Sequence, residues 1–184
     1  MAGGEEKKNT ASELRQDLVT GDWVIIATAR AKRPDEFIAP PRAAADGADI
    51  FEDPKASGQE EDTLIYMRPD GDWSLRVFPN KYPAVSRSNG RPKSLADGPY
   101  FGMSAVGYHE VIVTRDANRS IALLETWQVA ELLDAYQDRY LALMNKASVS
   151  YIQIFHNHGK EAGASVPHPH SQLMAVPVVA PYVE

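Results

Sequence analysis

The sequence FHNHGKEAGASVPHPHSQ, residues 155–172, contains four of the chain's five histidines and organises the interpretation of the whole chain. A short run rich in β-branched and aromatic residues, 149–155, leads into it, and a second apolar run, 173–179, follows it. Such runs, separated by a polar loop with glycines, are typical of two strands and their connection. The pattern therefore predicts a strand, a polar loop and a second strand with histidines at its start.

In extended chain, residues two apart point to the same side, so His168, His170 and Gln172 are expected to share a face. Two imidazoles on one side could bind a metal ion, could act as general acid and base, or could supply one nucleophile toward phosphorus. A solvated histidine-rich loop without chemistry is the remaining alternative. The residues alone leave these four interpretations open.

The rest of the chain indicates an α+β fold with a mostly antiparallel sheet and one long helix. Apolar residues spaced three and four apart predict the helix over 129–144. A Pro-Asp-Gly-Asp turn at 69–72 predicts a hairpin, and Gly- and Pro-rich segments predict long loops. The other expected strands are 23–28, 63–67, 73–78 and 108–114, and the expected loops are 34–58 and 87–102.

Composition excludes several classes of function. A formal net charge of -6 argues against a nucleic-acid-binding face, which needs clustered cations. The chain has no cysteine, so disulfides and thiolate chemistry are excluded, and it has no apolar run long enough to predict a membrane span. We expect a disordered tail over 1–12, a single domain over 13–184, and a cytoplasmic location.

Several motifs together resemble galactose-1-phosphate uridylyltransferases, a family of the histidine-triad superfamily. The resemblance lies in Asn-x-Gly at 157–159, Gly-x-Ser at 163–165, His-Pro-His-x-Gln at 168–172, and four further segments in family order, at 17–24, 30–34, 77–84 and 107–111. It covers nearly the whole chain. The Gly-Ala-Ser before the histidines, and the serine between His170 and Gln172, are similar to the plant-type ADP-glucose phosphorylase branch.

The resemblance implies a histidine-triad-like sheet and a nucleotidyltransferase with His170 as its nucleophile. His170 would take a nucleoside monophosphate from a nucleoside diphosphate sugar and pass it to a sugar 1-phosphate. The His168 carbonyl would accept a hydrogen bond from His170, and Gln172 would stabilise the phosphate oxygens. The residues implied in substrate binding are Arg30, Arg33, Asn80, Asn157 and Ser165.

The sequence departs from the family at the structural zinc that many members bind. Asp49 and Glu52 stand where the family has a Cys-x-x-Cys pair, and Asn118 stands at its central histidine, so only His168 matches the family's ligands. Zinc could accept Asp49, Glu52 and His168, but carboxylates are weaker zinc ligands than thiolates. We therefore expect no metal and no other cofactor.

Family members have two related halves, and these motifs belong to the first. We therefore expect either a homodimer or a second half to complete the sugar site. The uridylyltransferase activity is the leading hypothesis. The alternatives are an ADP-glucose or dinucleotide phosphorylase, and a nucleotide-binding half-domain with little activity of its own.

Overall fold

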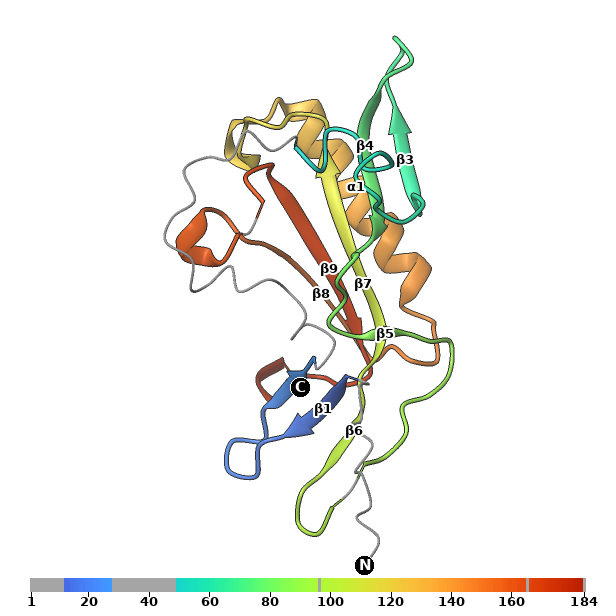
Figure 1. Ribbon diagram of the computed structural model, residues 1–184, viewed down its shortest axis with the longest axis vertical. Coiled ribbons are helices and arrows are strands. Elements are labelled where there is room, and N and C mark those ends of the chain that lie inside the picture. Colours follow the sequence, from blue (N-terminus) through green and yellow to red (C-terminus); the bar gives the residue numbers. More distant parts are fainter. Residues whose placement is uncertain (1–11, 28–48, 96, 165, 184) are drawn as a thin grey trace, which may run out of the picture.

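The computed structural model describes residues 12–27, 49–95, 97–164 and 166–183. Their strands form two sheets (Figure 1). The larger sheet has the order β3-β4-β7-β9-β8, and all of its neighbouring strands are antiparallel. Its strands are β3 (Leu64–Met67), β4 (Trp73–Pro79), β7 (Val106–Thr114), β9 (His170–Val176) and β8 (Tyr151–His156). A two-residue strand, β5 (Ser86–Arg87), pairs in parallel with the start of β7.

The smaller sheet has three antiparallel strands in the order β2-β1-β6. These are β2 (Trp23–Ile26), β1 (Glu13–Gln16) and β6 (Gly102–Ser104). The described residues also form single-turn 3-10 helices: η2 (Ile121–Leu123) and η3 (Lys160–Ala162) lie in connections, and η4 (Pro181–Val183) follows β9. The smaller sheet lies near the end of β9, where Val176 joins a cluster with Leu14 and Val85.

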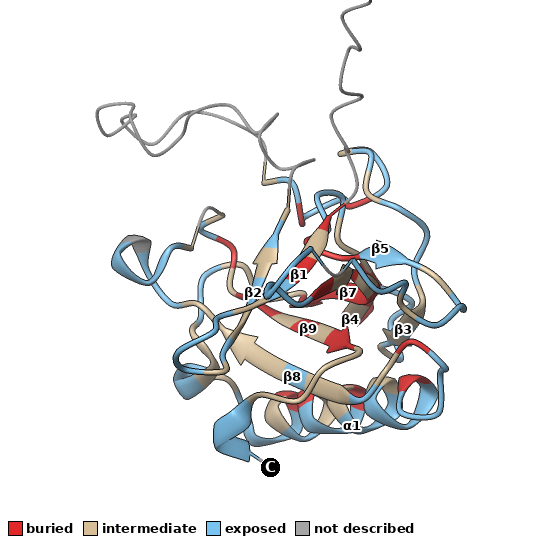
Figure 2. Cartoon of the chain, turned by 90° about the horizontal axis from the view of Figure 1, so that it is seen from below, coloured by how far each residue is buried: buried red, intermediate tan, exposed pale blue. Residues whose placement is uncertain are grey.

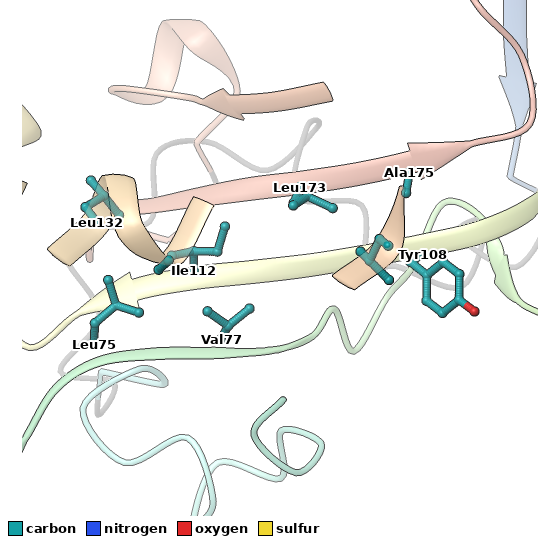
Figure 3. Close-up of a cluster of buried hydrophobic side chains, with 9 residues drawn as sticks. Leu75, Val77, Tyr108, Ile112, Leu132, Leu173 and Ala175 are labelled. Carbon is teal, nitrogen blue, oxygen red and sulfur yellow. The ribbon is translucent and has the colours of Figure 1, made fainter. Parts of the chain in front are cut away.

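Helix α1 (Thr126–Leu143) lies along one face of the larger sheet (Figures 1 and 2). A capping box defines its start, because the side chains of Glu125 and Gln128 each bind the other's backbone N–H. Its buried side chains include Leu132, Ala135 and Leu143. Figure 3 shows Leu132 beside the central strands, where the core consists of Leu75, Val77, Tyr108, Ile112, Leu173 and Ala175.

The opposite face of the sheet has a second apolar cluster. Because side chains alternate along a strand, Val111 and Val113 of β7 point away from the helix. They pack with Phe78, Trp73 and Phe51, the last from the loop before β3. Buried residues gather on β4, β7 and β9, so the sheet is covered on both faces where these strands run together (Figure 2).

The expected α+β class, with a mostly antiparallel sheet and one long helix, is confirmed. The strand expected at 173–179 begins earlier, at His170, because its pairing with β7 and β8 already starts at residues 170 and 171. The helix begins three residues earlier than expected, at the Glu125 cap. Trp127, on the first turn of α1, is 49% exposed, although a large apolar side chain on an amphipathic helix is usually buried. Residues 1–11 of the expected tail lie outside the described residues, while Ser12 is buried.

Candidate active site

His170 is the first residue of β9, opposite Val113 of β7. Its Nδ1 lies 2.9 Å from the carbonyl oxygen of His168, so the expected hydrogen bond is present. A carbonyl can only accept, and Nδ1 therefore carries the proton. This fixes the tautomer in which Nε2 keeps its lone pair, the form required of an imidazole nucleophile.

The environment of His170 favours the neutral ring. Burial lowers its pKa below the ordinary value, the hydrogen bond to the His168 carbonyl opposes this shift, and positive charge on His168 lowers the pKa further. A buried imidazole is costly to charge because water no longer solvates it. The ring is thus available as a base or a nucleophile at neutral pH.

His168 is completely buried and is held through both ring nitrogens. Nδ1 lies 2.7 Å from Oδ2 of Asp49, and Nε2 lies 2.8 Å from the carbonyl oxygen of Thr114. The Phe51 ring lies edge-on to His168 and to His170, with centroid separations of 5.8 and 5.1 Å. These contacts leave His168 no nitrogen for a reaction, so its position is that of a support for His170.

Gln172 lies two residues along β9 from His170 and therefore on the same face of the sheet. Its Oε1 lies 2.9 Å from Nε2 of His109, a buried residue of β7. The Ala84 backbone N–H donates to Nδ1 of His109, which places the His109 proton on Nε2, facing Gln172. No described residue accepts from the Gln172 amide nitrogen, so this donor is available to an anion.

Asn80 follows β4 and lies next to this pair. Its Nδ2 is 3.5 Å from Oε1 of Gln172, and its Oδ1 accepts from the Tyr82 backbone N–H. Asn80 therefore both supports a local turn and lies next to Gln172. Asn157 directly follows β8. Arg30, Arg33 and Ser165 lie outside the described residues.

His156 is a residue of this site for which the sequence indicated no role. It ends β8 opposite Ser171, and its Nδ1 lies 3.2 Å from Oγ of Ser171, which also contacts the Tyr136 hydroxyl at 2.5 Å. Burial, and then the charges of His170 and His158, lower the pKa of His156. His156 and His170 line the same small pocket, together with Thr114. The register of β8 and β9 pairs His156 with Ser171, the neighbour of His170, and such a contact between strands leaves no signal in sequence spacing.

The three candidate zinc ligands do not converge on one point. His168 has both nitrogens in hydrogen bonds, and the Glu52 carboxylate is paired with Arg115 at 2.7 Å. Asn118 is engaged in a local turn, where its backbone N–H donates to Asp116. Among the described residues no group of three or more His, Cys, Asp or Glu side chains could hold a metal ion. This arrangement does not fit the family's zinc.

The fold and the His-x-His pair that leads into β9 define a class of protein. It is an antiparallel α+β domain with a buried imidazole that a hydrogen bond holds in one tautomer. A solved structure described as an ADP-glucose phosphorylase from Arabidopsis thaliana with bound ADP-glucose shares this fold with a TM-score of 0.57. It is 30% identical, and the match covers 94% of this chain and 51% of that one.

Residues 4–180 match the N-terminal domain of the galactose-1-phosphate uridyl transferase family, and the chain belongs to this family. It is 36% identical to an ADP-glucose phosphorylase of Arabidopsis thaliana, over 98% of this chain and 53% of the relative. It is 32% identical to a galactose-1-phosphate uridylyltransferase of Thermotoga maritima, over 94% of this chain and 49% of that relative. The chain thus spans about half the length of these relatives.

In the described part of the chain, no helix has the length and apolar character needed to cross a membrane.

Proposed function

We propose that this protein transfers a nucleoside monophosphate between sugar 1-phosphates through a covalent nucleotidyl-His170 intermediate. The observation that carries the proposal is the hydrogen bond from Nδ1 of His170 to the His168 carbonyl, because it leaves Nε2 unprotonated. Membership of the family, and the ADP-glucose bound to a solved relative, support a nucleoside diphosphate sugar as the donor.

In the first half-reaction, Nε2 of His170 attacks the α-phosphorus of the nucleoside diphosphate sugar. The bond from this phosphorus to the bridging oxygen breaks, and the sugar 1-phosphate leaves with the electron pair. In the second half-reaction, a phosphate oxygen of the acceptor attacks the same phosphorus and releases His170. The leaving group is a stable anion, so the main requirement is stabilisation of charge on the nonbridging oxygens.

The Gln172 amide is suited to that stabilisation, because His109 holds its oxygen and leaves its nitrogen as a donor. Ser165 and Asn157 are proposed to contact the phosphates or the ribose. Arg30 and Arg33 are proposed to bind the diphosphate, for which the planar guanidinium is well shaped. Asn80, next to Gln172, completes the proposed set.

The second candidate is an ADP-glucose phosphorylase, in which inorganic phosphate replaces the acceptor sugar 1-phosphate. The 36% identity to the Arabidopsis thaliana phosphorylase favours it. The attack by His170 is the same in both candidates, and the base and the acceptor distinguish them. A domain that binds nucleotide without turnover is the third candidate, and it predicts binding with no covalent product.

Intact-protein mass spectrometry after mixing with UDP-glucose, and separately with ADP-glucose, tests the proposal. We expect the parent protein to gain the mass of one nucleoside monophosphate and His170→Ala to gain none. His158→Ala is the matched control, because His158 is exposed and should not change the result. The reactive sugar nucleotide identifies the base, and release of the adduct by sugar 1-phosphate or by inorganic phosphate identifies the acceptor. Nucleotide binding without an adduct in the parent would contradict the catalytic proposal.

A further inference from the structure

A turn formed by residues 49–52 contacts both histidines of the site. Oδ1 of Asp49 accepts from the Phe51 backbone N–H at 2.9 Å, and the Asp49 carbonyl accepts from the Glu52 N–H at 3.1 Å. The two oxygens of the Asp49 carboxylate therefore have different partners. Oδ1 shapes the turn, while Oδ2 reaches out of it to Nδ1 of His168.

The same turn is fixed to the end of β7. Glu52 pairs with Nη1 of Arg115 at 2.7 Å, and Nε of Arg115 contacts Asp72 at 3.0 Å. Arg115 directly follows Thr114, whose carbonyl accepts from Nε2 of His168. Two adjacent residues at the end of β7 thus hold the 49–52 turn and the His168 ring in one arrangement.

The hydrogen bonds of His168 are satisfied only if both its nitrogens donate or if Asp49 supplies a proton. The Thr114 carbonyl can only accept, and an ionised Asp49 carboxylate can only accept. In either arrangement the Asp49 carboxyl group is the partner of Nδ1, so the buried His168 ring has a partner at each nitrogen. Without the carboxylate, the buried ring would lose this partner and one of its two points of attachment.

A fixed His168 ring fixes the backbone that orients His170. The two residues are separated only by Pro169, whose ring restricts the backbone between them. The His168 carbonyl is the acceptor for Nδ1 of His170, so its direction sets where Nε2 points. Phe51, from the same turn, closes the side of the His170 ring.

We propose that Asp49 is a positioning residue that acts through His168 to hold the nucleophilic nitrogen of His170 in line for attack. This inference rests on the proposed function, because it assigns how the nucleophile of that reaction is oriented. Asp49 does not contact the reacting atoms. Its contribution is to the rate of the covalent step rather than to nucleotide affinity.

Rapid-mixing mass spectrometry measures the rate of adduct formation. Calorimetry measures nucleotide affinity without turnover when each variant also carries His170→Ala. We expect Asp49→Ala to slow adduct formation by about tenfold or more, because the reacting nitrogen is then misplaced. Nucleotide affinity should change by less than about threefold. Asp49→Asn keeps an acceptor for the turn and a polar contact to His168, and should restore most of the rate. Asp53→Ala is the matched control, because Asp53 caps a turn in the same loop and contacts no histidine.

A readout independent of activity separates this inference from the proposed function. Nitrogen-15 NMR of the histidine rings should show Nδ1 of His170 protonated and hydrogen-bonded in the parent and in Asp53→Ala, and released in Asp49→Ala. If the parent forms no adduct, the proposed function fails while this spectrum still tests the orientation of His170. Unchanged rate and spectrum in Asp49→Ala, or an Asp49→Asn rate as low as that of Asp49→Ala, would overturn the inference.

Discussion

His170 illustrates how a single side chain is prepared by its surroundings. Burial first, and then the positive charge of His168, lower its pKa below the ordinary value of 6.5, against the opposing effect of the His168 carbonyl. In the proposed reaction the neutral ring is the nucleophile, so the active form would persist to lower pH than it would in an exposed histidine. We expect adduct formation to stay constant as the pH falls through 6.5 and to decline only below it. A pH–rate profile of the single-turnover reaction measures this, and an inflection at or above 6.5 would contradict it.

His109 is a second residue whose role is determined by its neighbours. It accepts from the Ala84 N–H and donates to Gln172, so both of its nitrogens have partners. We expect His109→Leu to lose about 1–3 kcal/mol of unfolding free energy, because a buried donor and acceptor lose their partner. Adduct formation should also slow, since the Gln172 amide becomes free to turn. Urea denaturation and the single-turnover rate measure the two effects.

The control for that variant is His158→Leu, at an exposed histidine outside the sheet. It should change the unfolding free energy by less than about 0.5 kcal/mol, as is usual for surface sites. An effect of the same size in both variants would show that His109 has no special part in the network.

At the scale of elements, the sequence predicts α1 well in position and less well in orientation. Spacings of three and four placed the helix. The same spacings put Leu133, Tyr140 and Met144 on its apolar face, but these three side chains are exposed. Leu132 and Leu143 are buried together with Ala135. The half-buried Arg139 also faces the sheet, where its charge is paired with Glu110 of β7. Periodicity counts apolar residues, and it cannot identify a charged residue that faces the sheet because a distant strand supplies its partner.

The same limit applies to the site. The His-x-His-x-Gln pattern could be identified, because its chemistry lies within five adjacent residues. His109 could not, because its contact to Gln172 joins residues 63 positions apart. Asp49 was indicated beside His168 only as a possible zinc ligand, through the family resemblance, and its hydrogen bond to His168 over 119 positions was not predicted. Only the register of the sheet and the path of the loop bring them together.

The Glu110–Arg139 ion pair joins β7 to α1, and its contribution to stability can be tested. Two hydrogen bonds of 2.8 Å join them, and both side chains are largely buried. We expect Arg139→Met to cost about 3 kcal/mol of unfolding free energy, because it leaves a buried carboxylate without its cation. Chemical denaturation of both single variants and of the Glu110→Leu/Arg139→Met pair measures the coupling. The double variant should recover much of the loss, and a strictly additive result would contradict the expected coupling.

At the scale of the whole molecule, the site joins segments that are far apart in the chain. It uses the 49–52 turn, the end of β7, the end of β8 and the start of β9. Two of these segments also contribute to an apolar cluster, as Phe51 and Val113 do on the face away from the helix. The arrangement of His170 is therefore coupled to the folding of the entire sheet, and no single segment would preserve it.

This coupling leads to an expectation about metal. Asp49, Glu52 and His168 are already bound by protein groups, so a zinc ion would have to break existing contacts to bind there. A ligand that binds only the folded state raises the unfolding midpoint, and its removal lowers it. We expect the protein to contain less than stoichiometric zinc by elemental analysis, and EDTA to leave its thermal unfolding midpoint unchanged.

Asp49→Ala serves as the comparison in that experiment. Because it removes the carboxylate that faces buried His168, it should lower the unfolding midpoint by the same amount with and without EDTA. If a metal held the 49–52 turn instead, EDTA would destabilise the parent and have little further effect on the variant. Without a metal, the substitution lowers the midpoint and EDTA does not; with a metal, EDTA lowers the midpoint of the parent. Stoichiometric zinc together with a midpoint lowered by EDTA would contradict the metal-free arrangement.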